Sequence, residues 1–240
     1  MAKLSWDENG ERLYETGTRR GVLYPKSQAN QYDKGVAWNG LTGVTEKPSG
    51  AEETALYADD QKYLSLYSAE EFGFTVNAYT YPDEWAACDG SAELAPGVTV
   101  GQQVRIPFGM CYRTVLGNDQ AGENYGYKLH LIYNAKASPS ERSYATINDS
   151  PDAITFSWEC KTTPQNIDDE HKPTACIVID STKADATKLA ALEAILYGTE
   201  SSEPRLPQPS EVVDLMSVPE ESTEETTEET TEETTEETTE

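Results

Sequence analysis

Two segments of the chain alternate apolar and polar residues in the manner of β-strands. Residues 127–134 read YKLHLIYN and residues 154–161 read ITFSWECK, and a polar stretch separates them. Successive side chains of a strand point to opposite faces of a sheet. The pattern therefore predicts a sheet with one buried face, whereas the other face meets solvent or a partner.

Further strand patterns recur through the first 180 residues and predict a mainly β fold. The additional candidates are residues 21–24, 34–45, 62–67, 71–79, 98–100, 103–116 and 174–180. A short helix is expected at Pro82–Cys88, because proline suits a first helical turn and Gly90 can end the helix.

A second helix is expected near residue 185, where the apolar pattern changes to a helical period. Thr182 and Asp185 stand at capping-box spacing, and Gly198 should end the helix. The apolar stripe at residues 189–196 fits packing on the helix's own sheet or on a neighbouring subunit.

The chain is strongly acidic, with a net charge of −25. Residues 220–240 form a Thr/Glu repeat with 11 glutamates and no basic residue; without them, 32 acidic residues face 18 basic ones, a net charge of −14. Such a body should repel nucleic acid. The repeat is expected to be disordered. It is interpreted either as a negatively charged brush or as an unselected low-complexity extension.

The four cysteines are widely spaced and have no neighbouring histidine, so a zinc site is not expected. They are Cys88, Cys111, Cys160 and Cys176. The favoured interpretation is reduced, buried thiols in a protein folded in the cytoplasm, although two disulfides also fit the spacing. The sequence shows no signal peptide and no segment with the ~20 apolar residues of a membrane helix, so no membrane partner is expected.

Residues for catalysis are scarce, since His130 and His171 are the only histidines. Catalytic triads and multi-histidine metal sites therefore lack their components, and no glycine-rich phosphate loop occurs. Glu159 with Asp149 or Asp152 could form the carboxylate pair of a glycosidase. Because the chain has 43 acidic residues, such pairs arise by chance. We expect no enzyme activity and no cofactor.

Several blocks of the sequence resemble those of a known protein family and follow one another in the same order as in that family. They are YETGTRRGVLYP at 14–25, GVAWNGLTGVTEKPSGAEETALYADDQKYL at 35–64, AYTYPDEWAACDG at 78–90, YGYKLHLIYNAKASPSERSYATINDSPDAITFSWE at 125–159 and KLAALEAILYG at 188–198. Over about residues 12–200 the chain resembles the major tail proteins of long-tailed bacteriophages with flexible, non-contractile tails. The resemblance implies two packed antiparallel sheets, a β-sandwich or barrel, with a short flanking helix, a projecting loop and terminal arms.

The resemblance also implies a division of the chain. Residues 1–20 would be an N-terminal arm, residues 21–182 the β domain, and residues 183–219 a C-terminal helix and arm; the repeat at 220–240 lies outside the resemblance. Proteins of this kind assemble into stacked rings. Within the β domain, residues 37–62 would form a loop that projects toward the adjacent ring. The expected inter-ring contacts are Trp38, Leu41, Val44, Leu56 and Tyr57, and the expected arm contacts are Trp6, Val213, Leu215 and Met216.

The implied function is a tail-tube subunit that assembles into stacked, hexameric rings whose acidic lumen conducts DNA. The residues expected to face the lumen are Lys128, His130, Asn134, Thr155, Ser157 and Glu159. The implied partners are further copies of the chain and the tape-measure, tail-terminator and baseplate proteins of a virion tail, after synthesis in the host cytoplasm. The alternatives are a tube protein of a contractile tail or secretion-type injection system, and a soluble β-sandwich that binds or hydrolyses a glycan.

Overall fold

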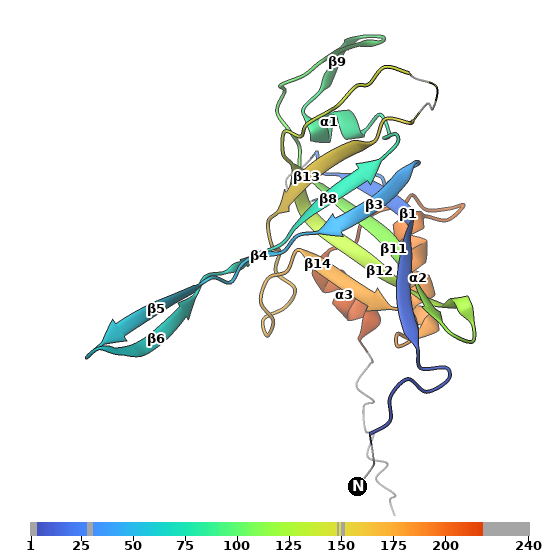
Figure 1. Ribbon diagram of the computed structural model, residues 1–240. Coiled ribbons are helices and arrows are strands. Elements are labelled where there is room, and N and C mark those ends of the chain that lie inside the picture. Colours follow the sequence, from blue (N-terminus) through green and yellow to red (C-terminus); the bar gives the residue numbers. More distant parts are fainter. Residues whose placement is uncertain (1–3, 28–30, 148, 150–151, 218–240) are drawn as a thin grey trace, which may run out of the picture.

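The computed structural model describes residues 4–27, 31–147, 149 and 152–217, and its largest element is one antiparallel sheet of eight strands (Figure 1). The strand order is β2-β1-β11-β12-β13-β8-β3, and β14 also pairs with β12. These strands are β1 (Leu13–Pro25), β2 (Val36–Ala37), β3 (Leu41–Glu46), β8 (Gly73–Ala78), β11 (Phe108–Asn118), β12 (Gly122–Ala137), β13 (Phe156–Thr162) and β14 (Cys176–Asp180). The predicted mainly β fold is confirmed.

Three small two-stranded sheets and three helices complete the described part of the chain. The small sheets pair β4 (Ser49–Gly50) with β7 (Glu70–Glu71), β5 (Glu53–Ala58) with β6 (Gln61–Tyr67), and β9 (Ala92–Ala95) with β10 (Val98–Val100). The helices are α1 (Trp85–Asp89), α2 (Ala186–Tyr197) and α3 (Pro209–Met216). The short helix predicted at 82–88 corresponds to α1, and Gly90 ends it with a left-handed φ of 78°.

The large sheet coils, so that its two halves face each other across a common core. Strands β1 and β3 come into contact although four strands separate them in the sheet order. Core side chains come from both halves, among them Leu23, Phe74, Val76, Met110 and Trp158. The two packed layers are therefore halves of one continuous sheet. They join where Ala135–Ala137 of β12 pairs with Cys160–Thr162 of β13.

One half of the sheet contains β1, β11, β12 and β14. Helices α2 and α3 cover the outer face of this half and form a second core with it (Figure 1). Leu189, Leu192 and Leu196 of α2 are buried in this core. The helical stripe thus packs on the helix's own sheet. As predicted, Gly198 ends α2, but the N-terminal cap is Asp185 rather than Thr182, since the Asp185 carboxylate accepts hydrogen bonds from the Thr187 and Lys188 amides.

Replacing Asp185 with alanine should lower the free energy of unfolding by about 1 kcal/mol, because two amides of the first turn lose their acceptor. Urea denaturation followed by circular dichroism would measure the change. Thr182→Ala is the matched control, since the Thr182 hydroxyl bonds Asp180 outside the helix. Equal losses in the two variants would show that Asp185 is not the cap.

Strand β12 changes its pairing partner at Asn134. Residues Lys128–Ile132 pair with β14, and Ala135–Ala137 pair with β13. Asn134 lies between these two stretches with a φ of 47°, a left-handed conformation that asparagine tolerates better than most residues. Its amide N–H donates to the Tyr32 hydroxyl at 2.9 Å. Asn134 is therefore a bend residue.

All four cysteines are unpaired, which agrees with the prediction of reduced thiols. Cys88, Cys111 and Cys160 are buried, and Cys176 is half-buried. Burial raises the pKa of Cys111 to about 11, so its thiol is protonated at neutral pH.

Candidate assembly surfaces

A two-stranded ribbon projects from the body between β3 and β8 (Figure 1). We call residues 47–72 the ribbon; β4 and β7 form its base, and β5 and β6 form its outer part. Its tip is a two-residue turn in which Asp59 and Asp60 have φ values of 50° and 60°, as a type I′ hairpin requires. A projection was predicted at residues 37–62, but it begins and ends about ten residues later.

Three of the residues expected on the projection belong to the body instead. Trp38 is buried in the core, where its indole N–H donates to the Thr80 carbonyl at 3.0 Å. Leu41 and Val44 lie on β3 and pack against the same core. The prediction was wrong for these residues because strand β3 pairs with β8 and closes the coiled sheet. Leu56 and Tyr57 do lie on the ribbon.

One face of the ribbon carries leucines. Leu56 lies opposite Leu64, and Leu66 lies opposite Thr54. Paired residues share a face of the sheet, as do residues two apart on one strand. Leu56, Leu64 and Leu66 therefore form one surface, the leucine face, with exposed fractions of 41%, 48% and 51%.

The opposite face of the ribbon is polar and aromatic. Lys62 pairs with the Glu53 carboxylate, which also accepts a hydrogen bond from Ser65. Tyr57 and Tyr67 are exposed on the same face. Of the two faces of the ribbon, only the leucine face thus carries a row of large aliphatic side chains, which the described part of the chain leaves partly uncovered.

The N-terminal arm is shorter than predicted, because β1 already begins at Leu13 and pairs with Asn118 of β11. Residues 4–12 continue beyond the end of β1 (Figure 1). Gly10 anchors them, since its N–H donates to the Asp119 carboxylate at 3.0 Å and its carbonyl accepts from Asn118 at 3.1 Å. Trp6 is 76% exposed. It is therefore available to a partner, as an arm contact must be.

The C-terminal arm residues pack mainly on their own subunit. Val212 of α3 is buried in the second core, and Leu215 and Met216 pack against it. Val213 lies on the exposed side of the helix. For Leu215 and Met216 the structure thus shows an intramolecular contact that the sequence did not predict. Residues 218–240, including the acidic repeat and its predicted disorder, lie outside the described residues.

The two alternating segments do not share one polar face. Ile132, two residues from His130, belongs to the core inside the coil, and so do Trp158 and Cys160 of β13. His130 consequently lies on the inner side of the sheet, whereas Glu159 points to the outer side. The prediction that both segments share one polar face was wrong, because β12 packs against a hydrophobic core on each of its two sides.

The six residues predicted to face a lumen differ in their surroundings. Lys128 is half-buried beside Glu15, His130 is 8% exposed, and Asn134 is half-buried at the bend in β12. On the other segment, Thr155 and Glu159 are exposed and Ser157 is half-buried. His130, which was expected to face the lumen, is thus almost completely buried in the subunit.

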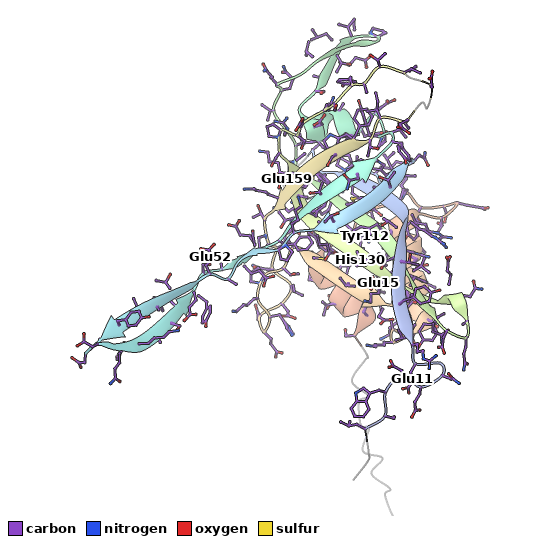
Figure 2. The ribbon with its side chains drawn as sticks, viewed as in Figure 1. Glu11, Glu15, Glu52, Tyr112, His130 and Glu159 are labelled. Carbon is purple, nitrogen blue, oxygen red and sulfur yellow. The ribbon has the colours of Figure 1, made fainter. Side chains whose placement is uncertain are left out.

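His130 belongs to a polar cluster that joins four strands of the coil. Its ring stacks on Tyr112 with centroids 4.6 Å apart, and its Nε2 lies 3.0 Å from the Thr114 hydroxyl. Glu15 of β1 and Glu46 of β3 approach the imidazole at 3.8 and 3.4 Å. Figure 2 shows Glu15, Tyr112 and His130 next to one another on the sheet. Distant residues form the cluster, so no local pattern in the sequence indicates it.

The cluster also ties the ribbon's base to the body, since the Tyr112 hydroxyl donates to Glu46 at 2.8 Å and Glu46 ends β3, directly before the ribbon. Burial lowers the pKa of His130 below its ordinary value of 6.5, although Glu46 and Glu15 oppose the shift; Lys128 adds to it. The folded protein therefore favours neutral imidazole at this position.

The free energy of unfolding should fall on acidification, because His130 becomes protonated. Below about pH 6.5 the unfolded chain binds a proton at His130 more readily than the folded chain does. Neutral His130 thus contributes fully to the free energy of unfolding above about pH 6.5. This contribution is lost as the pH falls through the lower pKa that His130 has in the folded protein. Urea denaturation at pH 7.5 and 5.0 should show a weaker pH dependence in His130→Gln than in the wild type. His171→Gln, which removes a histidine outside the cluster, is the comparison, and His130→Gln should differ from the wild type more than this variant does.

The described residues show no group of three histidine, cysteine or acidic side chains placed to hold a metal ion. No helix in the same part of the chain is long and apolar enough to cross a membrane. A comparison with models of protein families found no match, and a comparison with curated proteins found none either.

Proposed function

We propose that this protein is a structural subunit that assembles with copies of itself into stacked rings, the tube of a bacteriophage tail. In this proposal the ribbon contacts the adjacent ring, and the acidic body surrounds a channel that DNA passes without specific binding. Enzyme activity and cofactors play no part in it.

The observation that carries the proposal is the leucine face of the ribbon. An isolated two-stranded hairpin is at best marginally stable in water, and it needs a third strand or a packed hydrophobic face. The ribbon leaves the body, so the body cannot supply that packing (Figure 1). Leu56, Leu64 and Leu66 are half-exposed aliphatic residues in one row. A second copy that covers them would stabilise both the ribbon and the assembly.

Two further observations support a role in assembly over a role in chemistry. Apart from residues 220–240 the chain keeps a net charge of −14, which disfavours adhesion to DNA phosphates and suits a conduit. Trp6 adds a second exposed apolar anchor on an arm outside the sheet.

Size-exclusion chromatography and negative-stain microscopy of the purified full chain test the proposal directly. Rings or tubes formed by the protein alone are the expected result. A monomer at every concentration, with or without tail partner proteins, would overturn it. If such a monomer binds a glycan, the alternative of a carbohydrate-binding β protein is correct.

A further inference from the structure

A largely apolar pocket lies on the outer side of β1, between that strand and the C-terminal end of α2. Its volume is about 470 Å³, and its apolar lining includes Val22, Ala37, Leu196 and Pro204. The Tyr197 ring borders it, and the Arg20 guanidinium lies 5.9 Å from the centre of this ring. The pocket thus combines an apolar interior with one cation at its edge.

Arg20 has two unusual properties. Its φ is 53°, in the left-handed region that an arginine seldom adopts, and the pairing of β1 with β11 is interrupted between Arg19 and Val22. Such backbone conformations persist where the surrounding structure holds them, often at binding sites. Moreover, none of the described carboxylates lies within 4.0 Å of the Arg20 guanidinium, whereas the adjacent Arg19 pairs with Glu123 at 2.6 Å. Arg20 is thus a cation without an acidic partner in an acidic protein.

We infer that this pocket binds Trp6 of a second copy of the chain, with Asp7 and Glu8 of the same arm facing Arg20. The inference rests on the proposed self-assembly and names one of its contacts. An indole ring would contact the apolar lining and could stack beside the guanidinium, a favourable arrangement for tryptophan and arginine. The two acidic residues next to Trp6 supply the complementary charge.

The arm cannot reach the pocket of its own subunit while Gly10 stays anchored. The eight residues from Leu13 to Gly21 extend β1 over roughly 26 Å, at about 3.3 Å per residue. Gly10 is held at the far end of this strand, by Asn118 and Asp119. The four residues from Gly10 back to Trp6 span at most about 14 Å. The occupant must therefore be the arm of another copy.

The first test is a titration of the full chain carrying Trp6→Ala with a fluorescent peptide of residues 4–12, followed by anisotropy. This variant keeps the pocket and loses the competing indole. We expect saturable binding that weakens at least tenfold with the additional change Ala37→Glu, which places an acid in the pocket. Ala37 is exposed, so the fold should tolerate this change. A peptide with Trp6→Ala is the control and should not bind. Equal binding by both peptides, or to both proteins, would overturn the inference.

The second test uses the full chain with the photoreactive p-benzoylphenylalanine at position 6. After irradiation, mass spectrometry should find cross-links between two copies, from position 6 to residues 20–22, 35–37 or 196–204. Cross-links only within one copy, or only to other surfaces, would contradict the inference.

The two tests separate this contact from the proposed function. Tubes that form without a cross-link to the pocket would leave the assembly in place and remove the contact. Binding of the peptide by a protein that never forms rings would keep the contact and remove the tube.

Discussion

Replacing Trp85 with alanine should lower the free energy of unfolding by about 3–5 kcal/mol, the usual cost of removing a fully buried aromatic side chain. Trp85 is completely buried in the core inside the coil. Its ring centre lies 4.8 Å from that of Trp38, 4.9 Å from that of Phe108 and 5.3 Å from that of Trp158. These three partners come from the two halves of the sheet and from the segment after β2.

Urea denaturation followed by far-ultraviolet circular dichroism measures this effect without relying on tryptophan fluorescence. Trp6→Ala is the matched control, since the same residue type is removed from an exposed position, and its stability should change by less than about 0.5 kcal/mol. A loss below about 1 kcal/mol for Trp85→Ala would contradict the central position of this ring.

The elements that the sequence predicts well have a local cause. In β13 the alternation places Trp158 and Cys160 in the core and Glu159 outside, as expected. Helices α1 and α2 end at glycines that adopt left-handed φ values, Gly90 and Gly198. These signals depend on neighbouring residues alone, so they can be read without the tertiary structure.

The prediction fails where burial depends on distant segments. The pattern of β12 resembles that of a strand with one wet face, yet His130 is buried because Tyr112, Glu15 and Glu46 arrive from three other strands. Trp38 was expected on a projection, but it joins Trp85 and Trp158 in the core. Nothing within residues 34–45 indicates that this segment closes the coiled sheet.

The ribbon illustrates the same limit in the candidate assembly surface. Leu64 and Leu66 alternate with polar neighbours as in any half-buried strand, and the sequence predicted a strand at 62–67. The alternation itself could have identified these leucines as part of an apolar face. It does not tell whether that face packs on the body or awaits another copy, because this depends on where the chain leaves the sheet.

Changing Leu56, Leu64 and Leu66 together to threonine should prevent assembly while the subunit stays folded. Threonine favours strands, so the ribbon should keep its pairing. Each leucine is about half-exposed and would gain roughly 1 kcal/mol when covered, given about 1.5–3 kcal/mol for complete burial. Loss of the three leucines should therefore cost about 3 kcal/mol of contact free energy per ribbon. At about 1.4 kcal/mol per factor of ten, the affinity between neighbouring copies should fall roughly a hundredfold.

The concentration at which tubes first appear, measured by light scattering and negative-stain microscopy, should therefore rise at least a hundredfold in the triple variant. The matched control changes Leu94 and Val98 to threonine, since these exposed apolar residues lie on the other two-stranded ribbon, β9–β10. That variant should assemble like the wild type, because the β9–β10 ribbon carries no row of leucines. Normal assembly by the triple variant would show that the leucine face is not what holds neighbouring copies together. Loss of assembly in both variants would point to general exposed hydrophobicity and would likewise contradict a specific ring contact.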